Sequence, residues 1–292
     1  MKREASFFKN LSVYSVFSVR NLKTMLKLNP IRSEKVWGYE DWIASTHADG
    51  CQSEFKQLAG DYPLLVKVIQ ANDTLSVQVH PDDEDAKRLE GENERGKTEC
   101  WYVLSAEPGA SLVYGLKGNP GKEELRESIK ANSLESHLDR VEVKKGDFIF
   151  IPSGTVHAIG GGLRLLEVQQ SCNITYRLYD WGRPREVHIE KGVEVIKNEK
   201  KQKISPLGEE FECKYFALKK EPLKGGYSFL VSPSSKLVEL VFISGGEGTI
   251  RATAKDGSKT EHSFKAEEIF AVLPGEKITL EGKGEVIRIQ SK

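Results

Sequence analysis

Two pairs of side chains suited to metal binding or proton transfer recur at a spacing of two residues. Gln78 and His80 lie in residues 75–80, where polar and β-branched side chains alternate, and Lys97 and Glu99 precede a further apolar run. Successive side chains of a β-strand point to opposite faces, so each pair projects from one face of its segment. Imidazole, carboxylate and amide groups can bind a metal ion there, and lysine or glutamate can transfer protons. Each pair alone also fits a simpler alternative, a solvated polar face.

A histidine follows a tight turn in a third segment. Residues 146–157 have the spacing G-x5-P-x-G-x2-H, in which proline and glycine turn the chain sharply and set the depth of His157. This spacing resembles the second conserved motif of cupins; the alternative is an ordinary strand–turn–strand with an incidental histidine. The combined candidate metal ligands are Gln78, His80, Glu99 and His157. This set suits Zn²⁺ with open positions for substrate or water, and it also suits non-haem Fe²⁺, so ligand type does not decide the metal.

Short strands separated by frequent turns must position these residues. The segments that read as strands are residues 64–69, 75–80, 100–104, 148–151 and 165–168. Strands at this density are typical of a barrel or sandwich. Residues 82–94 and 122–138 read as helices, the second as an insertion between barrel strands. We therefore predict a mainly β fold: a cupin (jelly-roll) β-barrel with a short helical insertion.

The chain divides into three parts by composition. Residues 1–24 contain a weakly apolar run that serines interrupt, without a signal-peptide cleavage site, so we expect a disordered N-terminal extension. Residues 25–200 form the predicted catalytic domain, with a lysine-rich linker at 192–205. Residues 201–292 are again strand and turn, and we expect a smaller β-barrel-like domain. Its only histidine is His262, so we expect it to be structural.

Charge and cysteine content restrict the classes of partner and compartment. The 43 basic and 43 acidic residues give zero net charge, which gives no support to nucleic-acid or membrane-surface binding. No run approaches the roughly 18 apolar residues of a membrane span. The four cysteines include no C-x-x-C pair, so we expect free thiols. We expect a cytoplasmic protein with a small-molecule partner; the oligomeric state stays open.

Several motifs together resemble the type I mannose-6-phosphate isomerase family. They are WGYEDW at 37–42, LSVQVHPDD at 75–83, GKTECWY at 96–102, GTVHAI at 154–159, EVQQ at 167–170 and TYRLYDWGR at 175–183. The resemblance covers about residues 27–190 closely and suggests the short bacterial form. It implies interconversion of mannose 6-phosphate and fructose 6-phosphate, with one zinc ion per chain. Its implied zinc ligands are Gln78, His80, Glu99 and His157. It further implies Arg177 as an active-site arginine and Lys97 as a lysine of the same pocket.

The pattern around Arg177 agrees with that role. Alternation in residues 172–179 places Asn173, Thr175, Arg177 and Tyr179 on one face. A surface salt-bridge arginine is the simpler alternative, and the residues alone favour it.

An isomerase of this kind moves a proton between C1 and C2 through a cis-enediol. Arg177 would hold negative charge on the intermediate, and either Lys97 or a metal-bound water would be the base. The substrate phosphate needs a cationic cradle. Arg32, Lys35, Arg183 and Arg185 are candidates for this phosphate site, and the sequence does not rank them.

Two other functions are consistent with a cupin. One is an iron oxygenase, which would require Fe²⁺ and O₂. The other is a sugar-binding module without turnover, against which the intact Gln-His-Glu-His set argues, because a binding module needs no open metal site.

Overall fold

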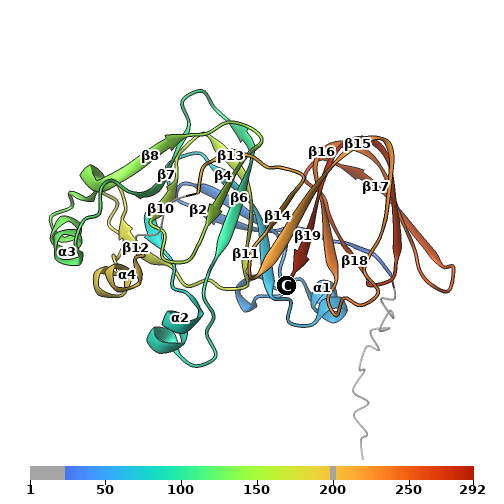
Figure 1. The fold of residues 1–292 in the computed structure, drawn as a ribbon, viewed down its shortest axis with the longest axis horizontal. Coiled ribbons are helices and arrows are strands. Elements are labelled where there is room, and N and C mark those ends of the chain that lie inside the picture. Colours follow the sequence, from blue (N-terminus) through green and yellow to red (C-terminus); the bar gives the residue numbers. More distant parts are fainter. Residues whose placement is uncertain (1–23, 198–201) are drawn as a thin grey trace, which may run out of the picture.

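Strands dominate this chain, and a computed structural model describes residues 24–197 and 202–292 (Figure 1). The described strands form three sheets. Two of these sheets, one of seven strands that includes Leu64–Ala71 and one of five strands, build what we call the first domain. The other seven-stranded sheet, which includes Glu239–Thr253, builds the second domain. The predicted extension at residues 1–24 lies outside the described residues except for Thr24.

The first domain is a sandwich of a seven-stranded and a five-stranded sheet. The larger has the order β13 (Ser205–Pro206), β9 (Asp147–Ile151), β6 (Glu99–Ala106), β11 (Leu163–Gln170), β4 (Leu64–Ala71), β3 (Gly38–Ala44) and β2 (Ile31–Lys35). The smaller has the order β12 (Tyr176–Tyr179), β5 (Val77–Val79), β10 (His157–Ile159), β7 (Ser111–Leu116) and β8 (Leu138–Glu142). Apolar side chains such as Trp101, Leu165 and Leu112 fill the space between the sheets. The mainly β prediction is confirmed, as two facing sheets rather than one closed barrel.

The second domain is one strongly curved sheet. It contains β1 (Leu26–Lys27), β18 (Ile269–Val272), β16 (Glu239–Thr253), β19 (Lys277–Ser291), β15 (Phe216–Leu230) and β14 (Glu210–Glu212), with β17 (Lys259–Lys265) paired to β16. Glycines face each other where the long strands bend: Gly246 has φ 94°, and a Cβ there would lie 1.8 Å from the Lys283 carbonyl oxygen. Only glycine tolerates both conditions.

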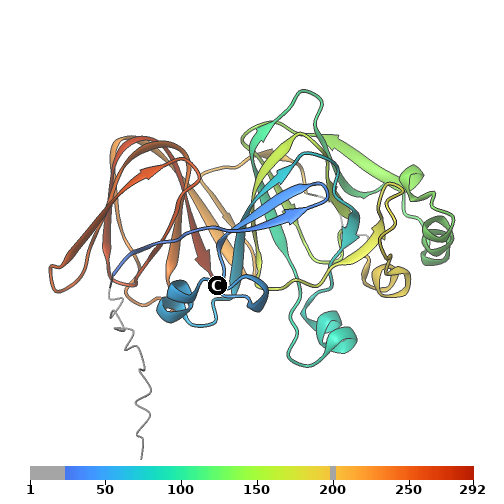
Figure 2. The same cartoon turned by 180° about the vertical axis from the view of Figure 1, so that it is seen from behind.

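The ends of the two domains are exchanged. Near its N-terminus the chain pairs β1 with β18 of the second domain. Figure 2 shows the blue segment that then runs from the second domain to the first. Conversely, β13, which follows residue 200, pairs with β9 of the first domain. The predicted division at residue 200 stays a prediction. β1 precedes residue 200 but belongs to the sheet of the second domain, and β13 follows it but belongs to a sheet of the first domain.

The helices differ in length from those predicted. They are η1 (Ala48–Gly50), α1 (Ser53–Ala59), α2 (Asp83–Glu90), α3 (Lys122–Lys130), η2 (Leu134–His137) and α4 (Ile189–Val195). The helix predicted to reach residue 94 ends where Gly91 turns away at φ 137°. The helix predicted to reach residue 138 ends before Asn132, whose φ of 55° is left-handed. The predicted linker at 192–205 begins inside α4, and residues 198–201 lie outside the described part. Among the helices described, none is long and apolar enough to cross a membrane.

One sheet separates the site from the second domain. Alternate residues of β4, β6 and β11 face opposite sides: Glu99 and Trp101 face the first-domain interior, whereas Cys100 and Tyr102 pack against the second domain. The second-domain side of this interface includes Phe216, Leu218, Leu240, Phe242 and Ile287. Cys100 therefore faces away from Glu99, because successive residues of a strand point to opposite faces, and all four cysteines are free.

Candidate metal centre and active-site cavity

Three neighbouring strands bring predicted site residues into one row. Gln78 on β5 lies opposite His157 on β10 and opposite Arg177 on β12. Cross-strand partners project from the same face, so the three side chains stand side by side. Val77 and Val79 point to the other face, where they join an apolar cluster. The alternation inferred from the sequence is thus confirmed for this strand.

A buried cluster of potential metal ligands lies beside that row. One ligand atom from each of His80, Glu99 and His157 lies within 4.8 Å of the others. The His157 Nε2 is 3.3 Å from Glu99 Oε1, and the His80 Nε2 is 3.7 Å from Glu99 Oε2. The Gln78 side-chain amide approaches His157 Nε2 at 3.4 Å. All four predicted metal ligands therefore meet at one point of the first domain.

Backbone carbonyls orient both imidazoles. His80 Nδ1 lies 2.8 Å from the Ile174 carbonyl oxygen, and His157 Nδ1 lies 2.8 Å from that of Thr155. A carbonyl can only accept, so each Nδ1 carries the proton and donates it. Each Nε2 is then left with a lone pair directed to the centre of the cluster, the arrangement typical of metal-binding histidines.

Burial and the Lys97 charge set the pKa values of Glu99 and His80. Burial raises the pKa of Glu99, but Lys97 and the neighbouring histidines outweigh it and hold that pKa well below its usual value. Burial, and next the Lys97 ammonium, lower the pKa of His80 well below its usual value. Glu99 Oε1 is buried without a hydrogen-bond partner. A carboxylate with a free oxygen and two imidazoles whose Nε2 atoms face it form a donor set that suits a divalent cation.

A cavity of about 160 Å³ opens beside the cluster. Its lining includes Gln78 and Lys97, which also contact the cluster: Lys97 Nζ is 3.0 Å from His80 Nε2 and pairs with Glu99. Arg177 lines the same cavity, and its Nε is buried without a hydrogen-bond partner. Burial, and next the nearby Arg185, lower the pKa of Arg177. The Arg177 Nη1 group donates to the Glu186 carbonyl at 2.8 Å, so the Nε–H is a donor left for an anionic ligand in the cavity.

Comparison with known proteins points to one family. A family model described as the type I phosphomannose isomerase catalytic domain matches residues 25–103. The chain is 38% identical over 260 residues to a mannose-6-phosphate isomerase of Streptococcus mutans, covering 75% of this chain and 81% of that protein. The chain belongs to the type I mannose-6-phosphate isomerase family. The predicted family, and with it the prediction of an isomerase, is confirmed.

Solved structures of mannose-6-phosphate isomerases share the fold. A mannose 6-phosphate isomerase crystal structure from Bacillus subtilis superimposes with a TM-score of 0.78 at 26% identity, covering 92% of this chain and all (100%) of that one. A zinc-bound mannose 6-phosphate isomerase superimposes with a TM-score of 0.69 at 16% identity, covering 92% of this chain and 99% of that one. The first match supports the predicted cupin fold, and the second shows the likeness of fold alone.

Three charged residues of this isomerase's cavity were missed from the sequence. Glu40, Lys67 and Glu167 all line it. Lys67 Nζ lies 3.1 Å from Glu167 and 3.7 Å from Glu40, and Trp101 Nε1 donates to Glu167 at 2.9 Å. Burial opposes the charge of Lys67, but the two carboxylates keep its pKa above the usual value. For Lys67 and Glu167 the available signal was a lone charged residue within an apolar strand, because such residues are almost never buried unless paired.

The structure separates the candidate phosphate-binding cations. Lys35 and Arg185 line the cavity. Arg32 instead pairs with Asp41 on the exposed surface at 2.8 Å. Arg183 is bound to Asp180 and to the Thr74 carbonyl and is not part of the lining.

One residue predicted for the cavity face lies elsewhere. Asn173, Thr175 and Arg177 line the cavity, but Tyr179 is packed in the apolar cluster of the opposite face. The cause is a register shift between Arg177 and Tyr179 in the pairing of β12 with β5. Such a bulge reverses the alternation beyond it.

Proposed function

We propose that this chain interconverts D-mannose 6-phosphate and D-fructose 6-phosphate by metal-assisted proton transfer through a cis-enediol. The observation that carries the proposal is the juxtaposition of the buried His80–Glu99–His157 cluster with a cationic cavity lined by Lys97 and Arg177. Membership of the isomerase family supports the substrate pair.

The metal would be Zn²⁺, held by Gln78, His80, Glu99 and His157. The fit rests on the donor set, the lone pairs that the carbonyl-bound imidazoles direct inward, and the unpaired buried oxygen of Glu99. When bound, zinc supplies a Lewis acid that stabilises negative charge developing on the sugar oxygens without changing its redox state.

The cavity gives the two ends of the substrate different surroundings. Arg185 and Lys35 would bind the phosphate, because both line the cavity and carry charge of the required sign. Asp180 holds Arg185 by two hydrogen bonds of 2.5 and 2.7 Å, which fix the guanidinium in place. The sugar carbonyl end would then lie toward Lys97 and Gln78.

The reaction conserves atoms and electrons within the sugar. A base removes the proton from C2 of the aldose, the electron pair forms the C1–C2 double bond, and negative charge collects on the C1 oxygen. The proton of the C2 hydroxyl passes to the C1 oxygen, and return of a proton to C1 completes the ketose. We assign the proton transfer to Lys97, which must first be in its neutral form, and the stabilisation of the enediolate to Arg177.

Metal restoration tests this function. Metal-stripped protein would receive Zn²⁺ or Fe²⁺, with and without oxygen, while a coupled assay follows conversion of mannose 6-phosphate to fructose 6-phosphate. We expect zinc to restore turnover in the absence of oxygen. Oxygen consumption with Fe²⁺, without formation of fructose 6-phosphate, would support an oxygenase instead. Sugar-phosphate binding without turnover under any condition would support a binding module.

A further inference from the structure

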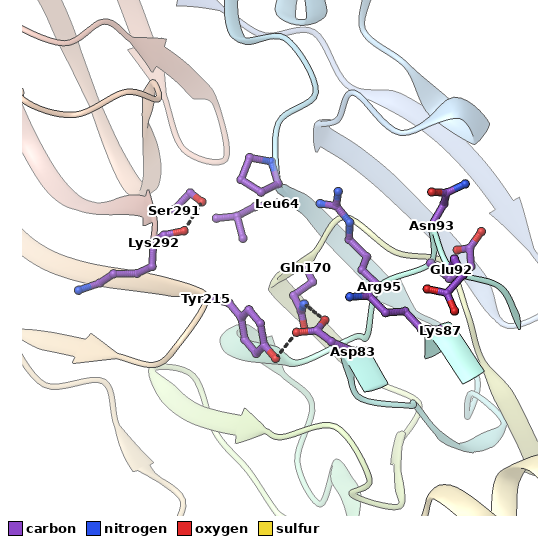
Figure 3. A pocket seen from close by; sticks show the side chains of 12 residues that line it. Leu64, Asp83, Lys87, Glu92, Asn93, Arg95, Gln170, Tyr215, Ser291 and Lys292 are labelled. Atoms are coloured by element: carbon purple, nitrogen blue, oxygen red, sulfur yellow. Dashed lines mark hydrogen bonds between the residues drawn. The ribbon is translucent and has the colours of Figure 1, made fainter. Parts of the chain in front are cut away.

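A carboxylate outside the cavity connects several segments of the proposed metal centre. Asp83, the first residue of α2, accepts hydrogen bonds on Oδ1 from the Gly96 backbone N–H at 3.0 Å and from the Gln170 side chain at 2.9 Å. On Oδ2 it accepts the Tyr215 hydroxyl at 2.8 Å. Figure 3 shows the Gln170 and Tyr215 side chains both meeting this carboxylate beside a cavity of about 340 Å³.

These bonds fix the segment that leads into Glu99. The Thr98 N–H donates to the Gln170 side-chain oxygen at 2.9 Å, and the Gln170 N–H donates to the Thr98 carbonyl at 3.1 Å. On the other side, the Lys97 N–H donates to the Pro81 carbonyl at 3.0 Å. Residues 96–98 are therefore held between β11 and the turn that follows His80.

Close packing leaves this segment little freedom. A Cβ at Gly96 would lie 2.4 Å from the Asp82 carbonyl carbon and 2.6 Å from the Asp83 nitrogen, so the two backbones touch. Thr98 is 4% exposed and Gln170 is 5% exposed, and water therefore cannot readily replace their mutual bonds. A shift of Asp83 would therefore move two backbone segments, the one that follows His80 and the one that precedes Glu99.

The second domain supplies the remaining bond. Tyr215 precedes β15 and is the second-domain residue whose hydroxyl reaches Asp83. Lys214 Nζ also approaches Asp83, at 3.5 Å, but its side chain is 74% exposed and its contribution is small. Tyr215 thus joins the second domain to the network around the ligand-bearing segments.

We propose that Asp83 is a positioning residue of the metal centre and that Tyr215 of the second domain holds it in place. This inference rests on the proposed metal site. It gives the second domain a part in metal binding, although no second-domain residue belongs to the ligand set.

A matched hydrogen bond across the same interface separates positioning from simple domain packing. The Tyr102 hydroxyl donates to second-domain Glu285 at 2.8 Å, and Tyr102 faces away from the metal ligands. Tyr215→Phe and Tyr102→Phe each remove one tyrosine–carboxylate bond between the domains. Of the two variants, Tyr215→Phe removes a hydrogen bond to Asp83, whereas Tyr102→Phe removes one to Glu285.

Zinc affinity, measured by competition with a chelator, tests the proposal without substrate. We expect Asp83→Ala to weaken zinc binding about 10- to 100-fold, in the range seen when groups that orient metal ligands are lost. Tyr215→Phe removes only one of the bonds to Asp83, and we expect a smaller loss of about 3- to 10-fold. Asp83→Asn, which keeps Oδ1 as an acceptor, is expected to recover part of the loss. Tyr102→Phe is expected to leave zinc affinity within about twofold of the parent.

Hydrogen exchange of residues 96–99 provides a second measurement that does not require metal. We expect faster exchange in Tyr215→Phe than in Tyr102→Phe. Equal zinc affinity and equal exchange in the two tyrosine variants would overturn the proposal, even if Asp83→Ala failed to fold. A parent protein that bound no zinc would overturn the metal site itself, and the exchange comparison would then decide the positioning of residues 96–99 alone.

Discussion

The orientation of the two imidazoles shows how single residues define the proposed metal site. Each Nδ1 is engaged by a carbonyl, of Ile174 or of Thr155, so each Nε2 faces Glu99. Placing Glu99 and His157 at 0% exposure costs free energy unless the groups find partners. A divalent cation at the proposed site would bind the free oxygen of Glu99 and the Nε2 atoms of both histidines together.

Arg177 is expected to act on the reaction rather than on the metal. Arg177→Ala should lower kcat about 10²- to 10³-fold, because one donor to developing negative charge is lost, while zinc content stays unchanged. Steady-state kinetics and metal analysis of the purified variant would measure both. Arg32→Ala serves as a control, since Arg32 pairs with Asp41 outside the cavity. Near-normal turnover of Arg177→Ala would disprove its role.

Lys67 is expected to matter for stability. Lys67→Met leaves the buried Glu167 and the nearby Glu40 without their cation, and loss of one partner of a buried pair costs about 3–5 kcal/mol. Urea unfolding of the metal-free protein would measure the loss. Lys56→Met is the control, because Lys56 pairs with Asp61 on the surface, and we expect it to have little effect. Equal stability of the two variants would contradict an ionised buried pair.

At the scale of elements, strand register decides which side chains meet. β10, β5 and β12 align His157, Gln78 and Arg177 in one row. A slip of one residue would turn each of them to the apolar face. The register shift in β12 does this to Tyr179 and adds its ring to the apolar cluster.

The contact between residue 96 and the start of α2 should tolerate only glycine. In Gly96→Ala the new Cβ would meet backbone atoms of Asp82 and Asp83, which cannot rotate away. We expect a loss of about 1–3 kcal/mol in urea unfolding, together with weaker zinc binding. Gly121→Ala is the control, because no atom lies within 4 Å of a Cβ built there. Unchanged stability of Gly96→Ala would show that the segment moves freely.

At the scale of the whole molecule, one sheet serves both domains. Strands β4, β6 and β11 direct Lys67, Glu99 and Glu167 to the site and an apolar surface to the second domain. Arg164 on β11 adds a bond to Glu267 at 2.8 Å, and Glu267 has a left-handed φ of 68°. A left-handed glutamate costs free energy, so this backbone conformation is held by the surrounding structure.

The link through Asp83 should weaken in acid. Burial raises the pKa of Asp83, but hydrogen bonds from Gln170, Tyr215 and Gly96 outweigh it and hold the pKa below the usual value. A depressed carboxylate pKa contributes stability above the unfolded value of about 3.9 and loses it as pH falls through the folded value. The stability difference between the metal-free parent and Asp83→Asn should therefore be constant from pH 7 to about 5 and shrink below about pH 4. Urea unfolding at several pH values would measure it; a difference that grew in acid would contradict this sign.

Residue types and the local faces of the site follow from the order of amino acids alone. Alternation put Gln78 and His80 on one face and Cys100 opposite Glu99, because the side-chain period of a strand is two whatever it pairs with. The Pro–Gly turn before His157 was likewise local. All five predicted strands are present.

Which distant charges meet depends on the folded chain. The pairing of Lys67 with Glu167, the presence of Arg185 but not Arg183 in the cavity, and the bond from Tyr215 to Asp83 each join strands or loops far apart in the chain. Such contacts depend on strand order, register and domain docking. These follow from packing of the whole chain, and a period of two carries no information about them.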